Sequence, residues 1–237
     1  MPKLFFIILI SLLSSNCSKN CNSFKNNPNA FYGIDISHYQ NNKSPINWDS
    51  LSIENNPKIS FVYIRTTMGK DGQDTAFKHN LRMAKKTGFK VGIYHYYRPN
   101  EKSNLQFENF KKHNLSIGDL PPVVDIEEKS ILGSKYLLKE ISNFLNLIEK
   151  HYGIKPIIYT PQRFYNTYLR NKFKEYEFWI ARQNGYIDSP DNNQMKKEPV
   201  LFDTRCPLIW QYSGTGSVQG IKGNVDLNVI YKPIWDI

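Results

Sequence analysis

The sequence predicts an α/β fold: a single β/α barrel of the TIM-barrel type, with an irregular last third, over residues 31–237. Three observations support this fold class. First, short apolar runs alternate with helical patterns from Tyr32 onward. Second, there are eight such apolar runs. Third, acidic residues stand in or beside several of the runs. A chain of 237 residues, 40% of them hydrophobic, is long enough to bury one such core.

The elements follow one another in β/α order for most of the chain. The clearest helix is Ser134–Tyr152, because its apolar residues share one stripe and Gly153 can end it. Other helices are expected at Asp74–Thr87, Asn104–Asn114 and Phe164–Phe173, whereas the last three strands are joined by loops without a helical pattern. The candidate strands are Tyr32–Ser37, Phe61–Thr67, Lys90–Tyr97, Pro122–Glu127, Pro156–Thr160, Phe178–Arg182, Leu208–Ser213 and Val225–Tyr231.

The N-terminus has the features of an export signal. Residues 1–16 predict a signal peptide, since Lys3 precedes the apolar run Leu4–Leu13, which is too short to span a bilayer. Cys17 follows in a context that resembles a bacterial lipoprotein signal, so lipidation is expected there, with plain cleavage nearby as the alternative. Residues 17–30 are polar and predict a flexible tether.

The remaining cysteines and the net charge give no indication of a metal-binding or nucleic-acid-binding protein. We expect Cys21 and Cys206 to be free thiols, a bridge between them being the less favoured alternative, and no metal-ligand spacing is present. The formal charge is +10, from 31 Lys and Arg against 21 Asp and Glu, and it is spread along the chain. No nucleic-acid-binding motif accompanies it, so the charge indicates only a general preference for polyanions.

The most informative segment, Pro121–Glu128, predicts a buried strand that ends in two carboxylates. Residues i and i+2 of a strand share a face, so Asp125 and Glu127 point the same way, on the face that also carries Val123. Paired carboxylates with unequal pKa values are the usual groups that cleave a glycosidic bond. A structural ion pair or a helix-capping carboxylate is the alternative interpretation.

Further polar residues fall at the same end of the expected barrel. Asp35 lies near the end of the first strand, Tyr94 and Tyr96 near the end of the third, and Asp226 in the eighth. Barrel enzymes build their sites from the C-terminal ends of several strands. We therefore expect these side chains to meet the Asp-x-Glu pair in one site.

Seven short motifs in register resemble a known family, and they cover about Tyr32 to Tyr231. The family is glycoside hydrolase family 25, the lysozymes that act as N-acetylmuramidases. The motifs are Gly33-Ile34-Asp35-Ile36-Ser37-His38-Tyr39-Gln40, Phe61-Val62-Tyr63-Ile64-Arg65, Gly92-Ile93-Tyr94-His95-Tyr96, Pro122-Val123-Val124-Asp125-Ile126-Glu127, Trp179-Ile180-Ala181-Arg182, Trp210-Gln211-Tyr212-Ser213 and Val225-Asp226-Leu227-Asn228.

This resemblance implies cleavage of the β-1,4 bond between N-acetylmuramic acid and N-acetylglucosamine in peptidoglycan. Glu127 would be the general acid and then the general base, with its pKa raised by the like charge of Asp125. Asp35 and Asp226 match the family's other acidic positions. The residues implied or considered for substrate binding are Tyr94, Tyr96, Trp179, Trp210 and Tyr212.

The attacking group is left open between a carboxylate and the acetamido group of the substrate. The Asp-x-Glu arrangement resembles that of substrate-assisted glycosidases, which favours the acetamido group, with Asp125 orienting it. The separation of the carboxylates would bear on this choice, and a sequence does not contain it.

Several nearby residues have structural interpretations. His38 and His95 are expected to be hydrogen-bonded scaffold residues. Glu128 should face away from the catalytic pair and be solvated or capping, and Asp74 should be the N-cap of a helix. Asp226 could instead hold the last strand by accepting backbone hydrogen bonds.

Two other functions compete with a muramidase: a barrel that binds cell-wall glycans without cleaving them, and a hydrolase of another N-acetylated glycan such as chitin. The order of the motifs favours the muramidase. We expect peptidoglycan as the partner, no nucleic acid, no cofactor or metal, and a monomer. The expected location is the cell envelope or beyond it, with membrane attachment through a lipidated Cys17.

Overall fold

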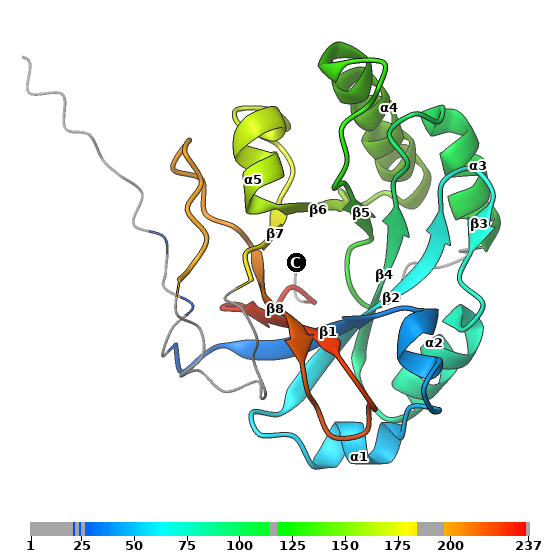
Figure 1. The fold of residues 1–237 in the computed structure, drawn as a ribbon, viewed down its shortest axis with the longest axis vertical. Helices are drawn as coiled ribbons and strands as arrows, with labels where there is room; N and C mark the ends of the chain where they lie inside the picture. Colours follow the sequence, from blue (N-terminus) through cyan, green and yellow to red (C-terminus); the bar gives the residue numbers. More distant parts are fainter. Residues whose placement is uncertain (1–20, 22–23, 25–26, 114–117, 184–196, 236–237) are drawn as a thin grey trace, which may run out of the picture.

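Eight strands follow one another around a closed barrel, with helices packed outside it (Figure 1). The computed structural model describes residues 21, 24, 27–113, 118–183 and 197–235. The barrel closes because β1 pairs with both β2 and β9. The strands are β1 (Phe31–Ile36), β2 (Ile59–Met68), β4 (Lys90–Tyr96), β5 (Val123–Asp125), β6 (Ile157–Pro161), β7 (Phe178–Ala181), β8 (Ile209–Gly216) and β9 (Val225–Ile230), and a short β3 (Gly72–Gln73) pairs with the end of β2.

The direction of the last strand differs from the parallel sheet that the sequence predicts. Neighbouring strands from β1 to β8 are parallel around the barrel, whereas β9 runs antiparallel to both β8 and β1. The loop of residues 217–224 is too short for a crossover helix, so the chain turns back as a hairpin. The start of β9, not its end, therefore meets the C-terminal ends of the other strands.

Helices cover the outside of the barrel, and α3 and α4 pack side by side there (Figure 1). The predicted helix α4 is confirmed at Ser134–Tyr152: its apolar stripe is buried, and Gly153 ends it at φ 71°. The short helix α1 was not predicted, because six residues are too few to show a helical period. The other helices are α1 (Trp48–Ile53), α2 (Phe77–Lys86), α3 (Ser103–His113), α5 (Gln162–Phe164), the 3-10 turn η1 (His38–Asn41) and the π-helical turn η2 (Tyr165–Leu169). None of the helices in the described ranges is long and apolar enough to cross a bilayer.

Aromatic rings fill much of the barrel interior. Strand alternation turns Phe61 and Tyr63 inward, while their neighbours on β2 pack against the outer helices. Two glycines make room for these rings: a Cβ on Gly33 would lie 2.4 Å from the Phe61 ring, and one on Gly92 would lie 2.2 Å from the Tyr63 ring.

The segment before β1 is attached to the barrel at two points. Cys21 forms a disulfide with Cys206, so the expectation of free thiols is wrong. Phe24 is 2% exposed, and its ring contacts those of Trp210 and Tyr231 at centroid distances of 5.7 and 5.3 Å. At these positions the expected tether is part of the packed structure. The predicted signal peptide and Cys17 lie outside the described residues.

Candidate active site

A cavity of about 200 Å³ opens where the parallel strands end. The four expected carboxylates line it, together with Tyr94, Tyr96 and Trp179 of the expected substrate-binding residues. The complete lining is Asp35, Ile36, Ser37, Tyr39, Gln40, Arg65, Tyr94, Tyr96, Val123, Asp125, Glu127, Tyr159, Trp179 and Asp226. Among the described His, Cys, Asp and Glu side chains, no group of three or more is arranged to hold a metal ion.

Asp35 is held rigidly at the end of β1. Its Oδ2 accepts hydrogen bonds from Nε2 of Gln211 at 3.0 Å and from Nδ2 of Asn228 at 2.8 Å. Asn228 is oriented in turn, because its Oδ1 accepts the indole N–H of Trp179 at 2.9 Å. Burial raises the pKa of Asp35, and the two amide donors oppose that rise.

Asp226 lies directly opposite Asp35 in the antiparallel pairing of β1 and β9. Burial, followed by the negative charge of Asp35, raises the pKa of Asp226 to about 9. Asp226 therefore holds a proton near neutral pH, while the two amide donors favour the charged form of Asp35. Asp226 reaches the cavity from the start of its strand, and this is possible only because β9 is reversed.

Asp125 and Glu127 form the second carboxylate pair, and they are hydrogen-bonded to each other. Asp125 is 6% exposed, and no described residue donates a hydrogen bond to its Oδ1. Burial and then the charge of Glu127 raise the pKa of Asp125 well above its ordinary value. Oδ1 is therefore a buried acceptor that a ligand could satisfy.

Glu127 is the less buried member of this pair, and its pKa is raised for a different reason from the one expected. Burial is the main cause, whereas the hydrogen bond with Asp125 lowers the pKa. The like charge that raises it comes from Asp35 and Glu128. A raised pKa keeps Glu127 available as a proton donor, which is the property that a general acid needs.

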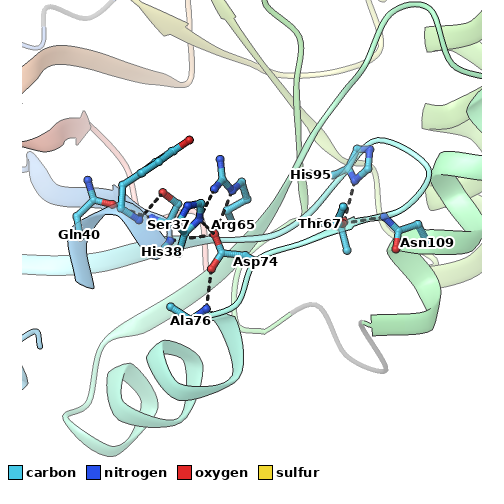
Figure 2. A network of polar contacts seen from close by, with 11 residues as sticks. Ser37, His38, Gln40, Arg65, Thr67, Asp74, Ala76, His95 and Asn109 are labelled. Carbon is cyan, nitrogen blue, oxygen red and sulfur yellow. Dashed lines mark hydrogen bonds and ion pairs between the residues drawn. The ribbon is translucent and has the colours of Figure 1, made fainter. Parts of the chain in front are cut away.

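Arg65 is the one cation among the described residues that line the cavity, and the sequence interpretation missed it as a site residue. Its Nε donates to Oδ2 of Asp74 at 3.1 Å, and its Nη2 lies 2.7 Å from Nδ1 of His38 (Figure 2). The guanidinium also lies over the ring of Tyr39, 5.3 Å from its centroid. The positive charge of Arg65 opposes the rise in the pKa of Asp125.

Asp74 contacts both the backbone just before α2 and the side chain of Arg65. Its Oδ1 accepts from the backbone N–H of Ala76, but α2 has Ala76 as its N-cap and no side-chain cap hydrogen bond, so the expectation that Asp74 is the N-cap is wrong. Its Oδ2 accepts from Arg65 and from the backbone N–H of His38 at 2.9 Å (Figure 2). The Asp74 side chain is fully buried, so it fixes Arg65 from behind the cavity wall.

Tyr159 of β6 is a second site residue that the sequence interpretation missed. Its hydroxyl donates to Oε1 of Gln211 at 2.9 Å, which links it to Asp35 through one amide. Burial raises the pKa of both Tyr159 and Tyr94, so both phenols stay protonated. The signal for Tyr159 was present: it stands two residues after the inward-facing Ile157 and so shares its face.

Trp210 and Tyr212 do not reach the cavity, and this corrects their expected sugar-stacking role. Both side chains are fully buried in the layer between the strands and the outer elements, and the indole N–H of Trp210 donates to the carbonyl of Arg182 at 2.9 Å. Gln211 faces inward to contact Asp35, so its two strand neighbours must face outward.

The nearby residues expected to be structural have clear partners. His95 is buried, with Nδ1 2.8 Å from Oγ1 of Thr67 (Figure 2). Its Nε2 lies 3.2 Å from Oε1 of Gln106. Burial lowers its pKa to about 4, so it is neutral, as suits a scaffold residue. Glu128 is exposed and accepts a hydrogen bond from the Tyr96 hydroxyl at 2.9 Å.

Comparison with known proteins places this site in a family. The sequence profile of glycosyl hydrolases family 25 matches residues 34–221. The protein YegX of Escherichia coli K12 is 35% identical over 201 residues, which are 84% of this chain and 68% of that protein. Lysozyme M1 of Streptomyces globisporus is 30% identical over 210 residues, 83% of this chain and 66% of that protein.

Solved structures agree with the sequence relatives. A family 25 glycosyl hydrolase from Bacillus anthracis superposes with a TM-score of 0.72 at 28% identity, covering 86% of this chain and 89% of that one. A lysozyme from Streptomyces coelicolor gives a TM-score of 0.66 at 28% identity, covering 84% and 90%. The resemblance carried by the seven motifs is thereby confirmed. The chain belongs to the glycosyl hydrolases of family 25 and is a glycoside hydrolase of the lysozyme type.

Proposed function

We propose that this enzyme hydrolyses peptidoglycan at the β-1,4 bond between N-acetylmuramic acid and N-acetylglucosamine, with Glu127 as the general acid and base. The observation that carries the proposal is the half-buried Glu127, its pKa raised by burial, hydrogen-bonded to Asp125 in a cavity that also holds Asp35 and Asp226. Lysozymes among the relatives indicate the substrate class.

In the first step Glu127 donates its proton to the oxygen that leaves with the departing sugar. Before this transfer the proton that the pair shares must be on Glu127, with Asp125 bearing the negative charge that Arg65 favours. The free Oδ1 of Asp125 accepts the N–H of the substrate's acetamido group, so that the acetamido oxygen can attack the anomeric carbon. A glycan whose muramic acid lacks the N-acetyl group should then bind without being cleaved.

In the second step Glu127, now ionised, removes a proton from the incoming water, whose oxygen bonds to the anomeric carbon as the acetamido oxygen leaves it. Asp35 remains charged beside the reacting sugar, since two amides donate to it and Asp226 holds the proton of their pair. Its negative charge stabilises the positive charge that develops on the sugar ring. The phenols of Tyr94 and Tyr159 stay protonated; Tyr94 can donate a hydrogen bond to the substrate, whereas Tyr159 donates to Gln211.

The test is digestion of purified peptidoglycan by the parent enzyme, by Glu127→Gln and by the control Glu54→Gln, an exposed position away from the cavity, with mass spectrometry of the released fragments. We expect fragments with reducing muramic acid from the parent and the control, and a loss of at least about a hundredfold with Glu127→Gln. If the parent bound the wall but released nothing, the chain would be the glycan-binding barrel instead. Release of reducing glucosamine ends would contradict the assigned bond.

We also propose that residues 1–16 direct export and that Cys17 is lipidated, with residues 31–237 as the catalytic barrel. The disulfide between Cys21 and Cys206 supports export, since such bonds persist in oxidising compartments. Producing cells fed a labelled fatty acid should yield labelled enzyme from the parent and unlabelled enzyme from Cys17→Ala. Equal labelling of the two would remove Cys17 as the attachment site.

A further inference from the structure

A groove of about 420 Å³ lies beside the catalytic cavity and shares Glu127 with it. Asp35, Asp125 and Asp226 line the cavity but not this groove. The sugar that becomes positively charged must lie among those carboxylates, and the acid must reach the oxygen that joins it to the leaving sugar. The groove, called the leaving-side groove below, therefore lies where the departing part of the glycan would be.

One wall of the leaving-side groove is aromatic. Phe164 of α5 and Tyr168 of η2 pack with ring centroids 4.7 Å apart at an interplanar angle of 42°. Phe164 is buried, whereas Tyr168 is half-buried and borders the groove. An aromatic ring in this position offers a flat apolar surface that suits a sugar face.

The other notable feature of the leaving-side groove is positive charge. Lys129 and Arg163 line it, both are exposed, and within the described ranges neither side chain takes part in an ion pair. Glu127 is the one acidic residue in the lining. Two cations without an ion-pair partner among the described residues are therefore available to an anionic ligand.

We propose that Lys129 and Arg163 bind the carboxylates of the stem peptide carried by the glycan on the leaving side of the cleaved bond. This inference rests on the proposed muramidase function. N-acetylglucosamine is neutral and would gain no charge interaction with two cations, whereas the stem peptide of the next muramic acid carries carboxylates. The aromatic wall would hold the sugar, and the cations would select strands that still bear their peptides.

The experiment compares kcat/KM on two soluble substrates: glycan strands with stem peptides, and the same strands after an amidase has removed the peptides. The variant is Lys129→Gln/Arg163→Gln. The matched control is Lys139→Gln/Arg170→Gln, which makes the same change of charge at exposed positions outside the groove. We expect the variant to lose about fivefold on peptide-bearing strands, the size of two exposed ion pairs, and little on stripped strands.

Three further results test the stem-peptide site. The parent's preference for peptide-bearing strands should weaken as salt is raised, since exposed charges are screened. A variant that matches the parent on both substrates, or loses equally on both, overturns the stem-peptide site while leaving the muramidase intact. A parent that releases no reducing ends from either substrate overturns the proposed function, and the inference with it.

Discussion

Four carboxylates share one cavity, and the pKa of each one depends on its own neighbours. Asp35 receives two amide donors, Asp226 faces the charge of Asp35, and Asp125 and Glu127 share a hydrogen bond beside Arg65. Burial raises the pKa of all four, and these neighbours then raise or lower it differently for the two members of each pair. The residue types alone could not reveal that difference.

The proton on Asp226 should make the stability of the enzyme depend on pH. Its pKa rises from 3.8 to about 9 on folding, so the folded chain keeps a proton that the unfolded chain releases. The free energy of unfolding should therefore fall as pH rises from about 4 to about 9. Asp226→Asn cannot titrate, so its Tm should fall less than the parent's between pH 5 and pH 9 in thermal unfolding followed by circular dichroism. Parallel Tm profiles would refute this origin.

Asp74 should act on the reaction through Arg65. In Asp74→Asn the anchoring charge is lost, and a displaced Arg65 would no longer oppose the rise in the pKa of Asp125. The limb of the pH–rate profile that reports ionisation of Asp125 should move to higher pH, with kcat about tenfold lower on the acidic side. Exposed Asp49→Asn is the control. A lowered Tm with an unchanged profile would leave Asp74 with a structural role only.

At the scale of elements, the reversed β9 and the inward-facing aromatics decide where the site can be. The hairpin between β8 and β9 brings the start of β9 to the rim, opposite the end of β1. Tyr63 of β2 packs over Gly92 of the neighbouring β4, and its hydroxyl donates to the carbonyl of Pro121 at 3.1 Å. Its ring also contacts Trp179, which lines the cavity, at a centroid distance of 5.0 Å.

Gly92→Ala tests that packing. The added Cβ would lie 2.2 Å from the Tyr63 ring, which is fully buried and cannot move aside freely. We expect a loss of about 1–3 kcal/mol in the free energy of unfolding, measured by urea denaturation. Combining it with Tyr63→Leu should cause less than the sum of the two single losses, because the smaller side chain makes room. Strict additivity would show that the two residues do not compete for space.

At the scale of the whole molecule, a disulfide and ring contacts attach the N-terminal segment to residues in the last third of the chain. Cys21 and Cys206 are separated by 185 residues in sequence, and Phe24 packs on Trp210 and Tyr231 in the same region. If Cys17 carries a lipid, this attachment leaves few residues between the membrane and the barrel. The reach of the enzyme into the wall would then be set near Cys21 rather than by a long free tether.

The disulfide should also stabilise the fold. Removing it with Cys21→Ser/Cys206→Ser should lower the free energy of unfolding by about 2–4 kcal/mol, because a long loop is no longer closed in the unfolded chain. Calorimetry with and without a reducing agent checks this. The reductant should lower the Tm of the parent and leave that of the variant unchanged. A parent insensitive to reduction would argue against the bridge.

Much of the architecture could be predicted because it depends on local pattern. Apolar runs located every strand of the barrel, the stripe and Gly153 bounded α4, and the motifs identified the family and all four carboxylates. Two-residue alternation also placed Asp125 and Glu127 on one face.

Only the tertiary structure decided which residues meet across the barrel. The direction of β9, the outward position of Trp210 and Tyr212, the bond between Cys21 and Cys206, and the entry of Arg65 and Tyr159 into the cavity all depend on contacts between distant segments. The order of pKa values among the carboxylates has the same origin. Periodicity records which face of its own element a side chain occupies, whereas a partner far away in sequence is chosen by packing and burial that exist only in the closed barrel.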